Sequence, residues 1–450
     1  MNPNGPHITL RTWRISHAST KRTANVKGKP VVSIVGGTIW GNRGAESMLV
    51  TTIGRIRETH PEARFYVLSY YARKDRELVS DKTITVLSSK PLSMITRHFL
   101  AALMAALLVQ LGLKIPNTRF FHIARALHES DVLLDVGGIT FSDGREKFLP
   151  FNILTVWPAM ILGVPVVKLA QAVGPFRHNV NRILAKLFLT RCSHIFARGS
   201  RSAEHLQDLG LPESQWDEVP DVAFLYKSTY SLSNEGDSFV DQLTVWMEAA
   251  KKVGNQVVVL SPSVLVELQS QKKGLDYINR FLDLVRGNRH QPFVYIVMPN
   301  ATRKGSDKSH NNDLLTIQRM RAAAQEGGLD SDLLDRIAWV DEDINTASVR
   351  RIITMADLVI TSRYHAMISS LCLEKPTIVI GWGHKYKETL DYFGLGEFSL
   401  DFGDEKADLH ATVQKMLSNR QEVVHKLASH LPDVRSKAEI QFHWLDQVLE

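Results

Sequence analysis

Residues 355–388, MADLVITSRYHAMISSLCLEKPTIVIGWGHKYKE, contain two short apolar runs on either side of one helical segment. The runs, 357–361 and 377–380, are rich in β-branched side chains, which is typical of strands buried on both faces. Between them, residues 364–373 carry apolar side chains at helical spacing, and Ser362 is the expected N-cap of that helix. A strand, a helix and a strand in this order predict a parallel βαβ unit.

Basic residues follow directly after both predicted strands. Arg363 and His365 come after the first strand, and His384 and Lys385 come after the second. The carboxyl ends of parallel strands meet at one edge of a sheet, where open α/β sheets bind their ligands. Cationic side chains beside helix N–H groups favour an anion that carries phosphate or carboxylate. The structural alternatives are an ion pair of Arg363 with a facing carboxylate and an ordinary helix-start role for His365.

The composition is that of a globular protein with an anionic partner. The chain has 450 residues, of which 44% are hydrophobic and 22% charged, so it can form two to three domains. The net charge of +7 favours phosphorylated metabolites, nucleotides or an anionic membrane surface. No zinc-finger spacing, RNP-type motif or long basic run is present, so a nucleic-acid partner is not expected. No divalent-metal motif is present either, and we expect no cofactor.

Strand and helix patterns alternate along both halves of the chain, which predicts parallel βαβ units. In the first half, a single helix is expected over 151–162 and another over 202–209 with Ser200 as its N-cap. The strands expected there are 31–35, 64–69, 84–87, 131–136, 165–169, 194–197 and 219–224. Strands at 256–261, 292–298 and 336–340 join the two of the opening stretch in the second half. The predicted fold class is α/β, with two doubly wound Rossmann-like domains facing a cleft, as in GT-B glycosyltransferases.

Composition shifts divide the chain into five predicted parts. Residues 1–30 contain six Lys or Arg, no acid and no apolar core of a signal peptide, so we expect a disordered basic tail and a cytoplasmic protein. An N-terminal domain on the acceptor side (31–227), a linker with a connecting helix (228–253), a C-terminal domain on the donor side (254–395) and C-terminal helices (396–450) complete the division.

One segment, 99–113, is almost wholly apolar: FLAALMAALLVQLGL. It is shorter than the roughly 20 residues that a transmembrane helix requires. A buried helix is one interpretation. The other is a peripheral patch that docks the protein on the inner face of a membrane carrying a lipid-linked substrate.

Seven short motifs follow one another along the chain. They are GNRGAE at 41–46, GGITFSD at 137–143, QAVGP at 171–175, ARGSRS at 197–202, PDVAF at 220–224, SRYHAM at 362–367 and GHKYK at 383–387. Together they resemble the polysaccharide pyruvyl transferase family over about residues 31–395. The resemblance implies a GT-B-like fold and transfer of the pyruvyl group of phosphoenolpyruvate onto sugar hydroxyls of a polysaccharide or glycan precursor. The product is a pyruvate ketal, and phosphate is released.

The resemblance implies catalytic roles for Arg363 and His365, and a donor contact from Arg198 or Arg201. The residue chemistry agrees, because arginine and lysine neutralise carboxylate and phosphate groups. Histidine titrates near neutral pH, so His365 is the expected acid that protonates the donor, with His384 as the alternate. The expected donor-binding residues are therefore Arg198, Arg201, Lys385, His384 and Ser362.

Acceptor contacts are expected from the motifs of the first half. The candidates are Asn42, Gly44, Glu46, Gly137, Gly138, Asp143, Gln171 and Asp221. Asp143 and Asp221 could orient or deprotonate sugar hydroxyls; alternatively, Asp143 caps a turn and Asp221 stabilises a loop. The sequence departs from the family pattern at Ala45, Ile139 and Gly199, and two of these departures remove a carboxylate. The acceptor sugar and the oligomeric state stay open.

Two other functions fit the predicted architecture. A GT-B glycosyltransferase with a nucleotide-sugar donor would use the same cleft, and Glu374 or Glu388 would then bind the ribose hydroxyls. A catalytically silent scaffold paralogue is the other alternative. Such a protein would tolerate loss of Arg363 and His365, whereas this sequence keeps both.

Overall fold

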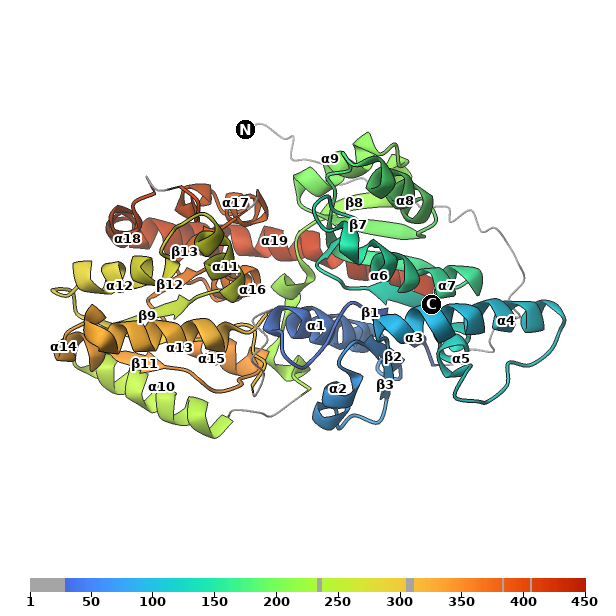
Figure 1. Ribbon diagram of the computed structural model, residues 1–450, viewed down its shortest axis with the longest axis horizontal. Coiled ribbons are helices and arrows are strands. Elements are labelled where there is room, and N and C mark those ends of the chain that lie inside the picture. The colour runs from blue at the N-terminus through green and yellow to red at the C-terminus, as the bar shows by residue number, and fades with distance from the viewer. Residues whose placement is uncertain (1–28, 233–236, 305–310, 383, 405–406) are drawn as a thin grey trace, which may run out of the picture.

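The computed structural model describes residues 29–232, 237–304, 311–382, 384–404 and 407–450. The predicted tail lies outside these residues except for Lys29 and Pro30. Figure 1 shows two lobes, each with a sheet between layers of helices, and the predicted α/β fold with two parallel-sheet domains is confirmed. Among the described residues, no helix is both long and apolar enough to cross a membrane.

The first lobe contains a parallel sheet with β1 near its centre, as expected for a doubly wound domain. In spatial order its strands are β3 (Ile84–Ser88), β2 (Arg64–Ser69), β1 (Val31–Val35), β4 (Val132–Asp135), β6 (Val166–Val173), β7 (His194–Arg198) and β8 (Trp216–Val219), and β5 (Ile139–Thr140) pairs with β6. Its α-helices are α1 (Arg43–Thr59), α2 (Ala72–Leu78), α3 (Pro91–Ser93), α4 (Phe99–Gln110), α5 (His122–Glu129), α6 (Leu149–Leu154), α7 (Trp157–Ile161), α8 (Asn179–Leu189) and α9 (Ser200–Asp208).

The second lobe contains a six-stranded parallel sheet. In spatial order its strands are β11 (Ile337–Trp339), β10 (Phe293–Val297), β9 (Gln256–Ser261), β12 (Leu358–Thr361), β13 (Thr377–Gly381) and β14 (Ser399–Asp401). Its α-helices are α10 (Asp237–Lys252), α11 (Val264–Lys272), α12 (Tyr277–Gly287), α13 (Asp313–Ala323), α14 (Ser331–Leu334), α15 (Thr346–Met355), α16 (Tyr364–Cys372), α17 (His384–Asp391), α18 (Leu409–Ser418) and α19 (Arg420–Leu449). All neighbouring strands are parallel, and their inner residues form the buried core of the lobe.

Two predicted elements of the first lobe are wrong. The strand expected at 219–224 ends at Val219, because Asp221 caps a 3₁₀ turn, η4 (Val222–Leu225), through a bond from the Ala223 N–H. The single helix expected over 151–162 is divided into α6 and α7, since Pro158 lacks the N–H that a continuous helix needs. In both places the apolar pattern indicated a buried segment, but a proline or a capping side chain determined which backbone conformation it adopts.

The last helix, α19, connects the lobes a second time. It continues to Leu449 and runs from the second lobe across the first, as Figure 1 shows. There the Trp444 ring lies 5.1 Å from the His194 ring, and the Gln441 side chain donates to the Pro220 carbonyl at 3.4 Å. The chain therefore crosses between the lobes twice.

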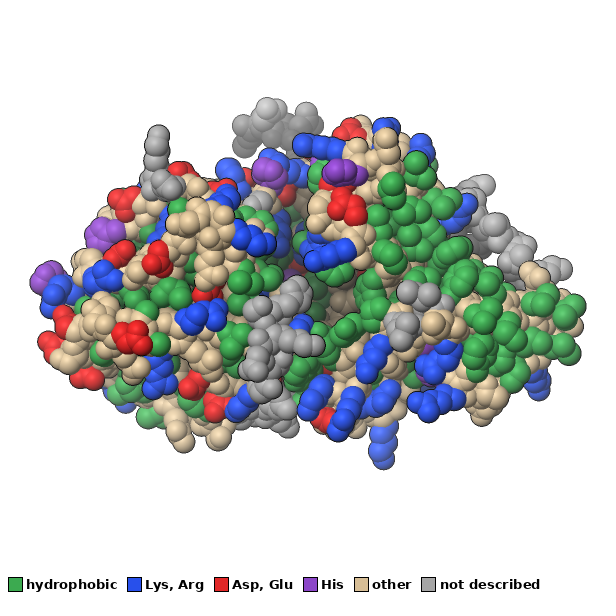
Figure 2. All heavy atoms as spheres, viewed as in Figure 1, with side chains coloured by type: hydrophobic (Ala, Val, Ile, Leu, Met, Phe, Trp, Pro, Cys, Tyr) green, Lys and Arg blue, Asp and Glu red, His purple; other side chains and the backbone are tan. Residues whose placement is uncertain are grey.

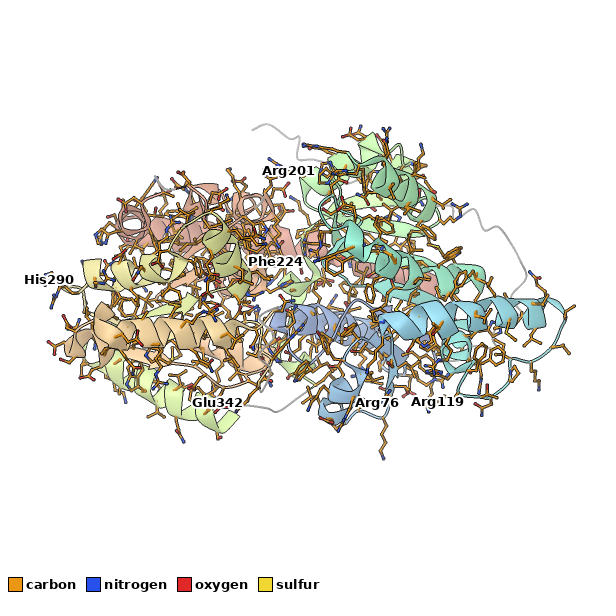
Figure 3. All side chains as sticks on the ribbon, in the orientation of Figure 1. Arg76, Arg119, Arg201, Phe224, His290 and Glu342 are labelled. Atoms are coloured by element: carbon orange, nitrogen blue, oxygen red, sulfur yellow. The ribbon has the colours of Figure 1, made fainter. Side chains whose placement is uncertain are left out.

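The loop before α1 is bonded directly to the second lobe. Asn42 and Ala301 form an antiparallel bridge, and the Thr302 N–H donates to the Gly41 carbonyl at 3.0 Å. Phe224, labelled near the centre of Figure 3, belongs to η4, which contacts α1, α16 and α19 at the same junction. The first glycine-rich motif is thus part of the joint between the lobes.

Candidate functional site

The carboxyl end of β12 leads into α16 at the junction of the lobes. Ser362 was predicted to cap this helix, but Arg363 is the N-cap residue, and no side chain of the described residues caps the first turn. The Ser362 hydroxyl instead accepts a hydrogen bond from the Tyr277 hydroxyl at 2.7 Å. The first amides of α16 therefore lack a side-chain acceptor, which suits an anionic ligand.

Arg198 brings three motifs of the first lobe together. It ends β7, and its guanidinium donates to Asp221 Oδ2 at 2.6 Å and to the Gly138 carbonyl at 2.8 Å. The same group lies 4.6 Å from the ring centroid of Tyr364, the first residue of α16. A cation held against an aromatic face is stabilised electrostatically, so Arg198 is fixed against the second lobe.

Asp221 links Arg198 to His365. Its buried carboxylate Oδ2 lies 3.6 Å from His365 Nε2, on the side opposite to the bond that caps η4. Burial alone would raise the pKa of Asp221, but His365 and Arg198 together hold that pKa far below its usual range. Asp221 is thus a fixed anion that orients an imidazole and a guanidinium.

Gly44 fits closely against the other edge of the imidazole. A Cβ atom placed on Gly44 would lie 2.2 Å from His365 Nδ1, a distance at which atoms overlap. The GNRGAE loop of the first lobe therefore confines a histidine of the second lobe, and any larger residue at position 44 would displace the ring.

Lys385 carries a positive charge without a carboxylate partner in the described chain. It lies in the first turn of α17, and its ammonium is 4.9 Å from the Tyr364 ring centroid and 5.2 Å from that of Tyr386. Burial, together with the positive charges of Arg198, Arg145 and Arg363, lowers the pKa of Lys385 to about 7. A cation destabilised in this way gains most from an anionic ligand.

Arg145 completes the positive cluster and was not among the predicted site residues. It lies in the turn between β5 and α6, and its guanidinium is 5.1 Å from the Phe148 ring centroid. Its side chain is exposed at the surface, and partial desolvation lowers the pKa of Arg145. Its position two residues after the GGITFSD motif was the signal that could have found it.

Arg363 has the ion pair that the structural alternative proposed. Its guanidinium binds Asp313, the first residue of α13, with Nε 3.1 Å from Oδ1. Asp313 also accepts from the backbone N–H groups of Val264, Asn300 and Ala301. Asp313 therefore holds Arg363 at a fixed place on the edge of the sheet, and it was not predicted from the sequence.

The structure separates the two arginines of the ARGSRS motif. Arg201, labelled at the top of Figure 3, lies on the first turn of α9 with an exposed side chain, whereas Arg198 is buried in the cluster. The predicted N-cap of α9 is also wrong: the helix begins at Ser200, and Gly199, at φ 79°, precedes it. Glu388 of the second lobe accepts from the Arg201 N–H at 3.0 Å and from the Ser200 hydroxyl. His384, at the start of α17, is exposed.

The family model described as Polysaccharide pyruvyl transferase matches residues 42–384, which include all of these groups except Lys385 and Glu388. The chain belongs to the polysaccharide pyruvyl transferase family.

Solved structures similar to this family member share its fold at low sequence identity. UDP-GlcNAc 2-epimerase from Neisseria meningitidis bound to UDP-GlcNAc is 12% identical, with 92% of this chain and 99% of that chain covered and a TM-score of 0.54. A Burkholderia vietnamiensis α,α-trehalose-phosphate synthase (UDP-forming) is also 12% identical, with coverages of 94% and 99% and a TM-score of 0.54. S. aureus MnaA, in a UDP co-structure, is 13% identical, with coverages of 89% and 91% and a TM-score of 0.53. These similarities show the GT-B fold.

Several predicted acceptor residues of this pyruvyl transferase family member form hydrogen bonds and ion pairs that hold the surrounding backbone in place. Asn42 caps α1 by accepting from the Gly44 N–H at 3.0 Å. Glu46 is 1% exposed, and its carboxylate accepts from Arg43 at 2.7 Å and from the Thr346 N–H at 3.1 Å. Arg43 also binds Asp343 of the second lobe at 2.9 Å. Glu46 therefore lies in a buried network that holds the lobes together.

The remaining candidates shape the loops after β4 and β6. The Gly137 N–H donates to Asp135, and the buried Gln171 side chain donates to the Asp135 carbonyl at 3.0 Å. Asp143 accepts from the Arg177 N–H at 2.6 Å and from Asn181 at 2.8 Å, which is the turn-capping alternative. These side chains fix the backbone that carries Gly138, the acceptor of the Arg198 bond.

A cavity of about 560 Å³ adjoins the GNRGAE loop. Asn42 lines it together with four aromatic side chains, Tyr70, Tyr71, Phe148 and Phe151. Arg303 of the second lobe closes one side, with its guanidinium 5.3 Å from the Tyr71 ring centroid. The tyrosine pair directly after β2 is the sequence feature that marks this cavity.

Proposed function

We propose that this protein transfers the pyruvyl group of phosphoenolpyruvate onto sugar hydroxyls of a polysaccharide or glycan precursor and releases phosphate. The observation that carries the proposal is the position of Lys385. Its ammonium lies beside Arg198 with no carboxylate within ion-pair distance in the described chain, and its pKa is lowered to about 7 by burial and by neighbouring cations. Such an arrangement is costly unless an anion binds there.

The charges of the site match a ligand with two anionic groups. Four cations, Arg145, Arg198, Arg363 and Lys385, outnumber the two buried carboxylates, Asp221 and Asp313, that are bonded to them. Phosphoenolpyruvate carries a carboxylate and a phosphate. Arginine binds either group in bidentate fashion, and the uncapped amides of α16 add further donors. We assign these residues to the donor, with Arg198 rather than Arg201 in direct contact.

His365 is the proposed acid. Before transfer, the buried anion Asp221 stabilises the protonated, positively charged imidazole. The imidazolium then delivers its proton to C3 of the enolpyruvyl group and becomes neutral. The first sugar hydroxyl then adds to C2 and loses its proton to the imidazole. The bond from C2 to the phosphate oxygen breaks, and a second hydroxyl closes the ketal. Of the two hydroxyl protons, one replaces the proton given to C3 and the other leaves on phosphate.

The acceptor is proposed to be a glycan that enters beside the GNRGAE loop. The aromatic cavity next to Asn42 offers flat apolar faces of the kind that stack on sugar rings. The solved neighbours bound to UDP or UDP-GlcNAc support a sugar ligand for this architecture. A lipid-linked glycan, cytoplasmic location and peripheral membrane contact through 99–113 remain parts of this proposal, as does the absence of a cofactor.

The nucleotide-sugar alternative receives no support from the two acids it would need. Glu374 lies at the far end of α16 from Arg363, where its backbone has φ 55°. Glu388 is bonded to Ser200 and Arg201. The Glu388 carboxylate lies against Gly199, next to Arg198, but these two donors already occupy it.

Calorimetric titration with phosphoenolpyruvate and with UDP-GlcNAc tests the proposal directly. We expect phosphoenolpyruvate to bind, and Lys385→Met and Arg198→Met to weaken its binding at least tenfold. Lys387→Met is the matched control, because Lys387 is exposed on the same helix and pairs with Asp391 at 3.0 Å. Binding of UDP-GlcNAc but not of phosphoenolpyruvate would refute the proposal and favour a glycosyltransferase.

A further inference from the structure

Helix α4 presents its large apolar side chains outward and its small ones inward. Ala101, Ala102 and Ala105 are buried against neighbouring helices. Leu103 and Leu107, by contrast, are exposed, with 57% of the Leu107 surface accessible. A helix that faced only water would have the opposite pattern, so this face is built for an apolar environment.

The exposed apolar surface extends beyond α4 onto α7 and α8. Trp157 of α7 connects the two, because its ring centroid lies 4.5 Å from that of Phe99 in α4 and 5.3 Å from that of Phe188 in α8. On α8, Val180, Ile183 and Leu187 follow a helical stripe, and 66% of the Ile183 surface is accessible. Figure 2 shows these hydrophobic side chains as one broad area over α4, α7 and α8, on the right of the view. We call this area the apolar face.

The two stretches of chain that carry α4 and α8 contain basic residues and no acids. From residue 82 to residue 128, which includes α4, there are six Lys or Arg and no Asp or Glu. From residue 174 to residue 203, which includes α8, there is also no Asp or Glu. This stretch contains five Lys or Arg besides the buried Arg198. Figure 2 shows Lys and Arg side chains gathered along the lower edge of the apolar face, and Arg119, labelled in Figure 3, lies at that edge. The combination is one of an apolar centre and a positive rim.

We infer that the apolar face of α4, α7 and α8 docks the protein on the surface of an anionic lipid bilayer. The leucine, isoleucine and tryptophan side chains enter the boundary between headgroups and acyl chains, and the basic rim binds anionic headgroups. A protein partner would need acidic residues around an apolar centre, whereas a bilayer offers both features over its whole surface. This inference rests on the membrane contact through 99–113 of the proposed function and extends it to α7 and α8, and it does not depend on the donor substrate.

Sedimentation of the full chain with lipid vesicles tests the inference. We expect binding to phosphatidylglycerol-containing vesicles, with at least tenfold weaker binding to pure phosphatidylcholine vesicles and at high salt. Leu103→Ser with Leu107→Ser on α4, and Ile183→Ser with Leu187→Ser on α8, should each weaken binding to the anionic vesicles at least tenfold. Because these positions are exposed, both variants should keep the melting temperature of the unchanged protein.

A matched control uses exposed apolar residues outside the apolar face. Val245, of which 66% is accessible, and Val253 lie on and just after α10 in the other lobe, so Val245→Ser with Val253→Ser should leave vesicle binding unchanged. Equal binding by all three variants would refute the inference, since another part of the chain would then hold the protein on the vesicle. The inference would also be refuted if the unchanged protein did not bind vesicles but formed a dimer in sedimentation velocity, and the α4 or α8 variant lost that dimer. The apolar face would then bind a second copy of the chain.

Discussion

The lowered pKa of Lys385 predicts that phosphoenolpyruvate binding depends on pH in a specific way. With a pKa of about 7 in the free protein, Lys385 is about half protonated at pH 7 and about one-tenth protonated at pH 8. If the ligand binds only the charged ammonium, the apparent Kd should rise about fivefold from pH 7 to 8 and about tenfold from pH 8 to 9. The phosphate of phosphoenolpyruvate is about nine-tenths doubly ionised at pH 7 and more so above it, because its second pKa is near 6, so its own titration adds little over this range.

The lowered pKa of Lys385 also affects the free energy of unfolding. It should make the ligand-free protein more stable as the pH rises, whereas ligand binding becomes weaker. The folded protein loses the Lys385 proton near pH 7, whereas the unfolded chain keeps it up to the ordinary value of 10.5. The difference corresponds to about 5 kcal/mol, as an upper limit, against the charged form in the absence of ligand. This cost is complete below pH 7 and disappears as the pH rises to 10.5, so Lys385→Met should stabilise the ligand-free protein most at low pH.

Calorimetry at constant ionic strength measures the binding effect, and titrations in two buffers of different ionisation enthalpy count the protons taken up. We expect about half a proton at pH 7 and about 0.9 at pH 8 on binding, as the fractions above require. Lys385→Arg keeps its charge at every pH tested and should bind without this dependence. A constant Kd for the unchanged protein, or an equal slope for Lys385→Arg, would refute the assignment of Lys385.

Three other predictions concern the described contacts, two of them with a matched control. Asp221→Asn leaves the buried Arg198 without its counter-charge and should lower the free energy of unfolding by about 3–5 kcal/mol in denaturant titrations, whereas Asp143→Asn at the exposed turn should cost less than about 1 kcal/mol. Arg43→Met leaves the carboxylates of Glu46 and Asp343 unpaired and should cost about 3 kcal/mol; Glu46→Gln should cost little, because burial already raises the pKa of Glu46 and Arg43 keeps Asp343. Equal losses of melting temperature for Arg43→Met and Glu46→Gln would contradict this account of the joint. Gly44→Ala places a methyl group against His365 and should reduce phosphate release at least tenfold with the melting temperature nearly unchanged; normal turnover would show that His365 can move without loss.

Local patterns were sufficient to predict most of the two sheets. The strands expected at 64–69 and 256–261 coincide with β2 and β9, because runs of β-branched residues between turn signals are determined locally. The expected strand at 219–224 failed at the point where Asp221 caps a 3₁₀ turn, and β14, only three residues long, had no recognisable pattern. Short elements depend on their neighbours more than on their own sequence.

The candidate site was predicted in part for the same reason. The positions after two predicted strands pointed to Arg363, His365 and Lys385, since the carboxyl ends of parallel strands share one edge. The family resemblance pointed to Arg198 or Arg201, and the structure places Arg198 beside the other three. The partners of these residues depend on how the two lobes meet, and sequence spacing does not contain that information. Asp313 lies 50 residues before Arg363, and Arg145 lies on the opposite lobe from Lys385. The same holds for Glu46, whose bonds to Thr346 cross 300 residues of chain.

Phosphate release from phosphoenolpyruvate, measured with a panel of glycan acceptors, tests the central claim most directly. The proposed transferase should release phosphate only when a suitable acceptor is present, and mass spectrometry should find one pyruvate ketal on that acceptor for each phosphate. His365→Ala should abolish both signals, while Lys387→Met should leave both intact. Phosphate release without an acceptor product, or full activity of His365→Ala, would contradict the account.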